Sequence, residues 1–564
     1  MLRVPVVVAF ACLAIACPIR SQTTKPKATA PDLAAEIAPI FADYAKPGSP
    51  GCAVMVLKNA KVAYEAGFGT AHLEHGIPIG PDTVFDIGST SKQFTAALIV
   101  LLALDGKLSL DDDIHKHIPE FPDYKAPITI RNLLHHTSGI RDYLPLLDFA
   151  GQSTENWTTN ADALAILLKQ KKLCFAPGTK HEYSNSGYML LSLIAERAAK
   201  KPFAELGQEK IFGPLGMTDT HIHDDHRRIV ARRAQAYSAT GPGAYGIEMS
   251  DFEQTGDGAV MTTVRDLAKW DENFTSGKVG GPKFLEIMNG RGALANGRAI
   301  DYGFGLVHTK LSGIPMVSHG GAWAGYRAEM LRFPTKETSV VVLSNLGQSN
   351  PSALARAVAG VVLKIKSRPT MAGATSAPAY VPSAAEMAAQ AGDYLSLADG
   401  RSGAVVVEGA KLQFKGRAST MPLVPIAAGK YRVDENGIEM SFLPADAKSP
   451  KKRLNMRVPG GQTISFVEYE PWTPTPAELA ACEGSYRSEE AGGAVFTVVV
   501  KDGAMALVGK NVPDAKARPL VKDAFNYQGI LIKFRRRADG SVAGMTVTMR
   551  GLTDLVFTKQ PMKK

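Results

Sequence analysis

The spacing of apolar residues divides the chain into two parts. In the first part, two strand-like runs flank the letters KNAK within residues 51–72, which predicts a β-hairpin. Helical spacing dominates residues 89–274, strand-like runs return at 302–346, and a helix is expected at about 350–366. Strands at both ends with helices between them favour one antiparallel sheet flanked by helices, in an α/β (α+β) domain.

The second part, after residue 383, consists of short alternating runs separated by Gly, Pro and Asp, which is typical of β-strands. It also repeats: AEMAAQAGDY at 385–394 is similar to AELAACEGSY at 477–486, and VVVEGAKL has a counterpart in VVVKDGAMAL. A repeat of roughly 90 residues indicates two copies of a small all-β domain, either a barrel or a sandwich.

The N-terminus predicts export. Arg3, a short apolar run and the small-residue pattern Ala14-Ile15-Ala16 are typical of a secretory signal peptide, and the run is too short to cross a membrane. We expect a secreted or periplasmic protein, with lipid anchoring at Cys17 as the alternative. The expected organisation is a signal peptide at 1–21, a linker at 22–34, the α/β domain at 35–366, a linker at 367–383, and β domains at 384–472 and 473–564.

Composition narrows the function classes. With 45% hydrophobic and 21% charged residues, the chain is globular rather than fibrous or disordered. Its net charge is +10, but the basic clusters are short, scattered and free of interleaved aromatics, so no nucleic-acid partner is expected. Association with an anionic cell envelope is left open. The three cysteines beyond the predicted signal are too few and too far apart for a disulfide framework, and they are expected in the core.

The stretch FDIGSTSKQFTAALIVLLAL at residues 85–104 places a lysine at the mouth of an apolar helix. Burying a lysine there costs folding free energy unless the amine is exposed to solvent, paired with another group or needed for catalysis. Ser89 and Lys92 are three residues apart and share one face of the helix. A serine hydroxyl at the positive end of a helix suits a nucleophile, and a desolvated lysine amine can accept its proton. The alternative is a helix-capping serine with an exposed lysine.

Two further motifs follow along the chain. Tyr183-Ser184-Asn185 forms a Y-x-N motif, and the letters HGG at 319–321 lie on a predicted strand. Together with LLHHTSGI, PLGMTDT and DGAVMTTVRDLAKW, they resemble the serine β-lactamase and penicillin-binding superfamily over residues 36–366. The resemblance is to class C β-lactamases, to the D-Ala-D-Ala carboxypeptidase/D-aminopeptidase group and to related carboxylesterases.

The resemblance implies a β-lactamase/transpeptidase-like domain that works through an acyl-enzyme. Ser89 would attack the acyl carbon, Lys92 and Tyr183 would carry its proton, and Tyr183 would later activate water. No organic cofactor and no metal are implied, and the substrate would be a small molecule or a short peptide. D-aminopeptidases of this superfamily carry two antiparallel barrels after the catalytic domain, as expected here. A stabilising or envelope-binding appendage is the other reading of this tail.

The resemblance also implies the substrate contacts. Asn185 would hold a substrate amide or orient the lysine, and the N–H groups of Ser89 and Ala322 would form the oxyanion hole. His319 and Gly321 would contact the substrate, with the glycine letting it lie against the strand edge. β-Lactamases of this group usually carry Lys-Thr-Gly where this chain has His-Gly, and a histidine is a weaker cation. We therefore expect a hydrolase of an ester or amide, such as a peptide with a D-residue. A β-lactamase or a penicillin-recognising sensor is the alternative.

The letters HIHDDH at 221–226 match the zinc motif of metallo-β-lactamase folds. That motif should follow a buried strand, whereas here it follows a helix-to-loop passage, so we interpret it as a polar surface loop. A zinc-dependent hydrolase is the alternative reading. We interpret the pair at 135–136 as structural loop histidines. The zinc ligands of the alternative would be His221, His223, Asp225 and His226, with His308 or His319 from elsewhere in the chain.

Overall fold

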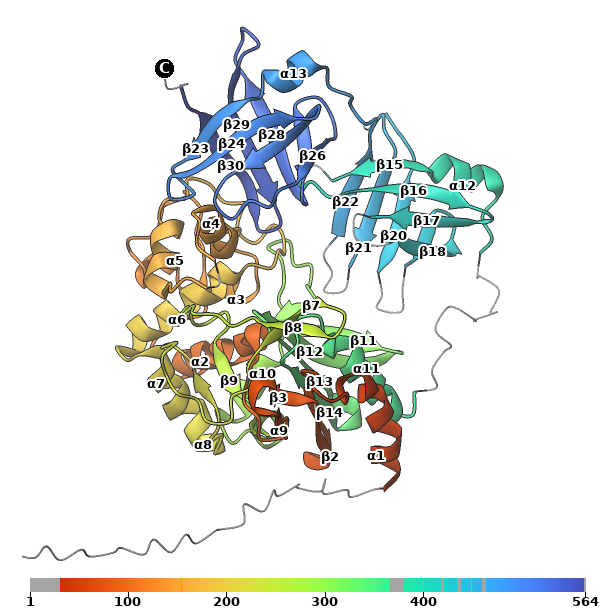
Figure 1. Cartoon of the computed structure of the whole chain (residues 1–564). Coiled ribbons are helices and arrows are strands. Elements are labelled where there is room, and N and C mark those ends of the chain that lie inside the picture. Colours follow the sequence, from red (N-terminus) through yellow and green to blue (C-terminus); the bar gives the residue numbers. More distant parts are fainter. Residues whose placement is uncertain are drawn as a thin grey trace, which may run out of the picture.

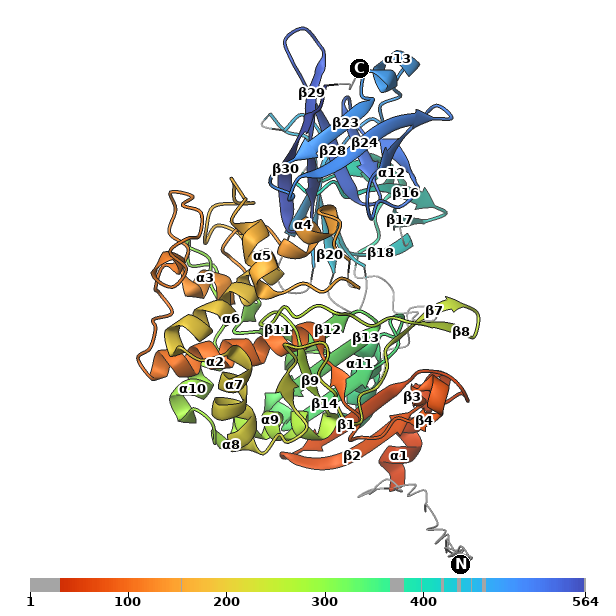
Figure 2. The ribbon, with the colours of Figure 1, turned by 60° about the vertical axis from the view of Figure 1, so that its left-hand side comes forward.

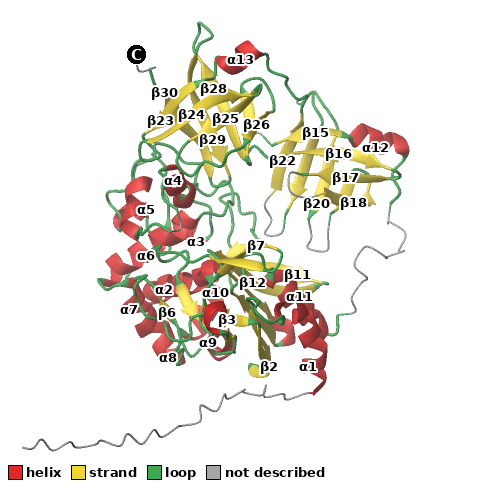
Figure 3. Cartoon of the chain, in the orientation of Figure 1, coloured by secondary structure: helices red, strands yellow, loops and turns green. Residues whose placement is uncertain are grey.

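The computed structural model describes residues 31–561, apart from residues 154, 366–379, 397, 417–419, 434–437, 448 and 459–462. The predicted signal peptide at 1–21, Cys17 and most of the two predicted linkers lie outside the described residues. The described chain forms an α/β part, coloured red to green in Figure 1, and two β-barrels, coloured cyan and blue. Figure 3 shows that the longer helices gather in the α/β part.

A seven-stranded antiparallel sheet forms the centre of the α/β part. The predicted hairpin pairs with the last strand of this sheet, Cys52 opposite Ser344, so both ends of the domain build one sheet. This confirms the predicted fold class. Asn59 and Ala60 form the hairpin turn with φ of 50° and 57°, as a tight two-residue turn requires. Across the sheet the strands are β10 (Tyr302–Gly303), β11 (Leu306–Leu311), β12 (Ile314–Trp323), β13 (Tyr326–Phe333), β14 (Thr338–Ser344), β1 (Cys52–Lys58) and β2 (Lys61–Phe68).

Helices cover both faces of the sheet, and β1 shows why its sequence is apolar throughout. Val54 and Val56 pack on one face, whereas Met55 and Leu57 pack on the other face against the main helical layer. A strand buried on both sides needs apolar residues at every position, and Cys52 is one of them. The first face is covered by α1 (Pro31–Ile37), η1 (Ala38–Tyr44) and α11 (Pro351–Val362).

The main helical layer lies between β2 and β10 in the sequence. Its helices are η2 (Leu73–His75), η3 (Gly88–Ser91), α2 (Lys92–Leu104), η4 (Ile114–Lys116), α3 (Ile130–Leu134), α4 (Tyr143–Phe149), α5 (Asn160–Leu167), α6 (Asn185–Ala199), α7 (Phe203–Gly207), η5 (Gln208–Phe212), α8 (Gly213–Leu215), α9 (Val264–Ser276) and α10 (Gly281–Met288). A further turn, η6 (Pro334–Lys336), joins β13 to β14. None of the helices in the described ranges is long and apolar enough to cross a membrane.

Three small sheets interrupt this layer, and the sequence did not predict them because such short strands show no clear alternation. They are β3 (Thr70–His72) with β4 (Ile77–Pro78), β5 (Phe85–Asp86) with β9 (Val260–Thr262) and β6 (His221–Ile222), and β7 (Tyr237–Gly241) with β8 (Ala244–Ile247).

The two predicted all-β units are closed eight-stranded barrels, in which the first strand pairs with the last: Tyr394 with Glu468, and Tyr486 with Lys559. Closure leaves no free sheet edge. The first barrel contains β15 (Gly392–Leu395), β16 (Ser402–Glu408), β17 (Lys411–Lys415), β18 (Thr420–Ala427), β19 (Lys430–Arg432), β20 (Glu439–Leu443), β21 (Arg453–Arg457) and β22 (Thr463–Glu468). The second contains β23 (Gly484–Ser488), β24 (Ala494–Lys501), β25 (Ala504–Val508), β26 (Lys516–Pro519), β27 (Ala524–Tyr527), β28 (Ile530–Arg536), β29 (Val542–Met549) and β30 (Leu552–Lys559).

The repeated sequence before each barrel forms the same local structure, a short helix that leads into the first strand. The helices α12 (Ala384–Gln390) and α13 (Pro476–Ala480) each begin with a capping box. A tyrosine on the first strand then donates its hydroxyl proton to a main-chain oxygen four residues earlier: Tyr394 to Gln390 (2.9 Å) and Tyr486 to Cys482 (2.6 Å). The sequence repeat is therefore a structural repeat that fixes how each barrel starts.

The second barrel packs directly on the helical layer, as Figures 1 and 2 show for α4 and α5. Phe149 of α4 and Phe496 of β24 meet edge to face, with ring centres 5.5 Å apart. Arg141 and Glu490 form an ion pair (2.7 Å) that is buried between the two parts. The second barrel is thus held by both apolar packing and a charge pair.

Candidate active site

Lys92 begins α2, is fully buried, and joins three parts of the chain through its amine. Its Nζ donates to Ser89 Oγ (3.1 Å), to Asn185 Oδ1 (2.9 Å) and to the main-chain oxygen of Asp257 (2.7 Å). Ser89 lies in the turn η3 that leads directly into α2, so the two side chains share a face as expected. The oxygens of Asn185 and Asp257 can only accept a hydrogen bond, whereas the Ser89 hydroxyl can also give its proton to the amine.

Tyr183 lies beside the same amine. It lies just before α6, and Lys92 Nζ is 4.9 Å from the centre of its ring. The ring packs against His136, with 4.3 Å between ring centres. No residue within the described ranges hydrogen-bonds the Tyr183 hydroxyl, and Tyr183 lines the same cavity as Ser89. The hydroxyl is therefore free to meet a substrate.

Asn185 uses both ends of its side-chain amide inside the protein. Its Oδ1 accepts from Lys92, and its Nδ2 donates to Asp142 Oδ2 (3.1 Å), which also accepts the Asn185 main-chain N–H (2.9 Å). Of the two roles that the resemblance implies, the geometry fits orientation of the lysine rather than a hold on a substrate amide. Asp142, which caps α4, is a residue of the site that the sequence reading missed.

Strand β12 lies against η3 so closely that only glycine fits at the contact. A Cβ on Gly321 would lie 1.8 Å from the main-chain oxygen of Ile87, and a Cβ on Gly88 would lie 2.7 Å from the nitrogen of Ala322. The chain's own Ile87 is thus one reason for a glycine at 321, and the contact of Gly321 with a substrate stays a prediction. Ser89 and Ala322 both line the cavity, and their oxyanion-hole role stays a prediction.

His319 is buried behind the cavity rather than exposed in it. Its Nε2 is 3.1 Å from the Tyr302 hydroxyl and its Nδ1 is 2.7 Å from the Gly320 oxygen. Burial, and then the nearby Lys92 charge, lower the pKa of His319 to about 4. The imidazole is neutral at neutral pH, so it supplies no charge for a substrate carboxylate.

The loop histidines behave as structural groups. His136 is buried, and its Nδ1 accepts the Ser184 N–H (3.3 Å), which fixes the chain just after Tyr183. Burial lowers the pKa of His136 well below its usual value. It therefore stays neutral beside the Lys92 amine, as the structural interpretation expects.

Two buried carboxyls, Asp86 and Asp257, line the cavity next to Ser89. Asp257 accepts a hydrogen bond from the Tyr143 hydroxyl (3.0 Å), and Asp86 accepts one from the Gly88 N–H (2.7 Å). Burial raises the pKa of both to about 6. Within the described ranges, neither forms an ion pair with a lysine or arginine side chain. The cavity is thus acidic on this side.

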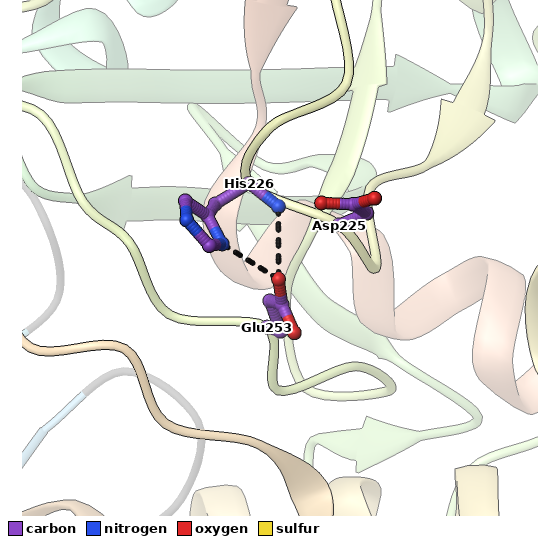
Figure 4. Close-up of side chains that lie close together, drawn as sticks. All are labelled: Asp225, His226 and Glu253. Carbon is purple, nitrogen blue, oxygen red and sulfur yellow. Dashed lines mark hydrogen bonds and ion pairs between the residues drawn. The ribbon is translucent and has the colours of Figure 1, made fainter.

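The residues of the letters HIHDDH do not converge on one point. His221 and His223 contact each other (3.2 Å), whereas His226 Nδ1 contacts Glu253 Oε1 (2.7 Å), as Figure 4 shows. Asp225 is held by Arg227 instead, at 2.9 and 3.1 Å. Among the described residues, the one group of three histidine, cysteine or acidic side chains close enough together to hold a metal ion is Asp225, His226 and Glu253, and this group does not include the first two histidines of the motif. The four-ligand zinc site is not formed.

The second barrel reaches the active site through the turn between β29 and β30. Gly551 O accepts the Asp142 N–H (2.7 Å), and Gly551 N donates to Glu182 Oε1 (3.1 Å). The neighbouring Arg550 guanidinium lies 5.8 Å from the centre of the Tyr183 ring. No sequence signal indicated this contact, because more than three hundred and fifty residues separate the two segments.

The fold and the serine–lysine–tyrosine site define a serine hydrolase. The Beta-lactamase family model matches residues 37–363, more than half of the chain, so this chain belongs to the beta-lactamase family. It is a beta-lactamase-related enzyme that works through a serine acyl-enzyme, as the resemblance implied.

Known relatives extend the match beyond the catalytic part. A D-aminopeptidase of Gluconobacter oxydans is 28% identical over 487 residues, which is 83% of this chain and 88% of that protein. A penicillin-binding protein of Bacillus subtilis is 31% identical over 317 residues, 52% of this chain and 67% of that protein. The octameric penicillin-binding protein homologue from Pyrococcus abyssi shares the fold, with a TM-score of 0.54 and 24% identity over 78% of this chain and 99% of that one.

Proposed function

We propose that this enzyme hydrolyses amides and short peptides whose acyl residue carries a free amino group and has the D-configuration. The observation that carries the proposal is the Lys92 amine, which holds the Ser89 hydroxyl beside Tyr183. The D-configuration is inferred from the relatives named D-aminopeptidase.

The reaction follows from the positions of three side chains. Ser89 Oγ attacks the carbonyl carbon, and its proton passes to the pair formed by the neutral Lys92 amine and the Tyr183 phenol, in which the amine lone pair receives it. The same pair returns the proton to the leaving nitrogen as the C–N bond breaks, which leaves an ester on Ser89. Water then gives a proton to the pair and attacks the ester, and the serine is restored. Asn185 keeps the lysine aimed at Ser89 during both steps.

The acidic side of the cavity supports an acyl group with an ammonium. Asp86 and Asp257 line the cavity near the nucleophile and form no ion pair among the described residues, although the charges of Arg233 and Lys92 act on them. A buried carboxylate favours a cation that replaces water. An amino-acyl group places its ammonium one carbon from the carbonyl that Ser89 attacks. The acyl residue of an amino-acid amide therefore fits this side of the cavity.

Efficient β-lactamase activity is not favoured, because the third motif offers a buried, neutral His319 where a lysine would bind the drug carboxylate. Esters with the same acyl group are expected substrates, since their leaving group departs more easily than an amine. We also propose export through the N-terminal segment, and an attraction of the basic chain to an anionic cell envelope.

A fluorophosphonate probe tests the nucleophile first. The intact mass of the wild-type protein should increase by one adduct, and that of Ser89→Ala should not change. D-alanine p-nitroanilide, its L-enantiomer, p-nitrophenyl acetate and nitrocefin then separate the substrate classes. Fastest turnover of the D-anilide supports the proposal. Fastest turnover of nitrocefin, or an adduct on the Ser89→Ala protein, contradicts it.

A further inference from the structure

Arg550 is an exposed cation of the second barrel that lies over the ring of Tyr183, a residue of the active-site cavity. Its guanidinium lies 5.8 Å from the Tyr183 ring centre, and its charge helps burial to lower the pKa of His181 to about 4. Within the described ranges, no carboxylate forms an ion pair with it. An arginine with its fork of donors unused, beside a reactive tyrosine, is a ready site for an anion.

The position of Arg550 is fixed by its neighbour. Gly551 is buried, and its two main-chain polar groups bind Asp142 and Glu182 of the catalytic part at 2.7 and 3.1 Å. Its φ is +74°, and a Cβ there would lie 3.1 Å from the Cβ of Asp142. The turn is therefore held against the catalytic domain, which fixes the Arg550 main chain beside Tyr183.

The other basic side chains near the site already have partners within the protein or are uncharged. Lys92 donates to three oxygens of the protein, and Lys180 is paired with Glu182 (2.5 Å). His319 is neutral at neutral pH because of its burial. Arg233 lines the cavity on its acidic side, where it faces Asp86. Arg550 is thus the cation on the Tyr183 side that a substrate can recruit.

We propose that Arg550 binds an α-carboxylate on the leaving side of the scissile bond, so that the enzyme prefers short peptides ending one residue after that bond. The leaving nitrogen must come within hydrogen-bond reach of the Lys92–Tyr183 pair to receive its proton. In an amino-acid leaving group the carboxylate is two bonds from that nitrogen, which places it beside Tyr183 and near the exposed Arg550 guanidinium. The inference rests on the proposed function and deepens it: the substrate is a zwitterionic dipeptide, with its ammonium at the acidic side and its carboxylate at Arg550.

Two matched peptides test this selectivity. D-Alanyl-D-alanine and D-alanyl-D-alaninamide differ only in the terminal carboxylate, and kcat/KM is measured for both. Arg550→Gln should lower the value for the free acid about tenfold or more, the size of a charge-assisted hydrogen bond, and leave the amide unchanged. Arg537→Gln is the control, since Arg537 is an exposed arginine at the opposite end of β29. It should change neither value.

Equal losses on both peptides, or no loss on the free acid, would overturn the inference. A second measurement does not depend on turnover: calorimetry with Ser89→Ala, with and without Arg550→Gln, compares the binding of the same two peptides. Tighter binding of the free acid that Arg550→Gln abolishes supports Arg550 even if the enzyme cleaves neither peptide, in which case only the proposed function fails. Equal binding of the two peptides to Ser89→Ala rejects Arg550 as the carboxylate site.

Discussion

Carboxyl groups outnumber amines among the buried side chains at the nucleophile. One buried amine, Lys92, lies among three buried carboxyls, Asp86, Asp142 and Asp257, whose pKa values burial raises. Asp142 accepts hydrogen bonds from the Asn185 side-chain amide and main-chain N–H, and it thereby helps to orient Lys92. The two carboxyls that line the cavity each accept one hydrogen bond, from the Gly88 N–H and the Tyr143 hydroxyl, and form no ion pair among the described residues. A buried carboxyl costs stability, which suggests that these two are kept for the substrate.

The Asp257→Asn variant tests this at the residue level. Burial raises the pKa of Asp257 to about 6, so the carboxyl is protonated below that pH and anionic above it. For D-alanine p-nitroanilide, kcat/KM relative to p-nitrophenyl acetate should rise with pH through about 6 in the wild type. Lys92, Asp142, Tyr143 and Asp86 face the same carboxyl, and Asp86 titrates in the same range.

The expected loss in Asp257→Asn is about tenfold at pH 7.5 for the anilide, with little change for the acetate, which has no ammonium. The pH-dependent rise should shrink to the part that Asp86 carries. An equal loss on both substrates would mean that Asp257 acts by placing Lys92 rather than by binding an ammonium.

At the scale of elements, the sequence predicts the features that arise from residues close together in the chain or from a repeat within it. The three-residue spacing of Ser89 and Lys92 fixed their shared face, and the internal repeat fixed the number of β domains. The role of Gly321 could not be predicted, because what fills the space beside a strand glycine depends on which element packs there. That element is η3, and its Ile87 oxygen lies where a Cβ would be. The position of Ser89 thus depends on a contact between η3 and β12, which are far apart in sequence.

Gly321→Ala should push η3 away from β12 and displace Ser89, because the new Cβ would lie 1.8 Å from the Ile87 oxygen. The rate of Ser89 labelling by the fluorophosphonate should fall roughly a hundredfold, since small displacements of a nucleophile are that costly. Gly360→Ala is the matched control, because its Cβ meets nothing within 4 Å on α11. Wild-type labelling of Gly321→Ala would show that the contact does not place the serine.

At the scale of the whole molecule, the catalytic site is completed by a domain that is not part of the family match. A continuous set of contacts runs from the second barrel to the nucleophile: Gly551 binds Asp142, which holds Asn185, which orients Lys92. The sequence predicted the barrel but not its place, since neither the repeat nor the composition says which surface a domain covers. Of the two readings of the tail, the structure gives this barrel contacts at the active site, whereas the first barrel packs against the second through Tyr469, Leu520 and Leu531.

The buried ion pair Arg141–Glu490 joins the second barrel to the catalytic domain. Both side chains are almost fully buried, and Arg141 also donates to the main-chain oxygen of Thr553 (2.8 Å). Glu490→Gln leaves the arginine charge without its carboxylate, so we expect a loss of about 3 kcal/mol and a lower urea midpoint. Activity should fall with it, because Arg141 precedes Asp142 and the turn with Arg550 belongs to the same interface. Glu489→Gln, which breaks an exposed pair with Arg487, should leave the midpoint and activity unchanged. If Glu490→Gln behaved like this neighbour, the ion pair would not be what holds the second barrel in place. The position of the barrel would then depend on its apolar packing and on the hydrogen bonds of Gly551 and Thr553.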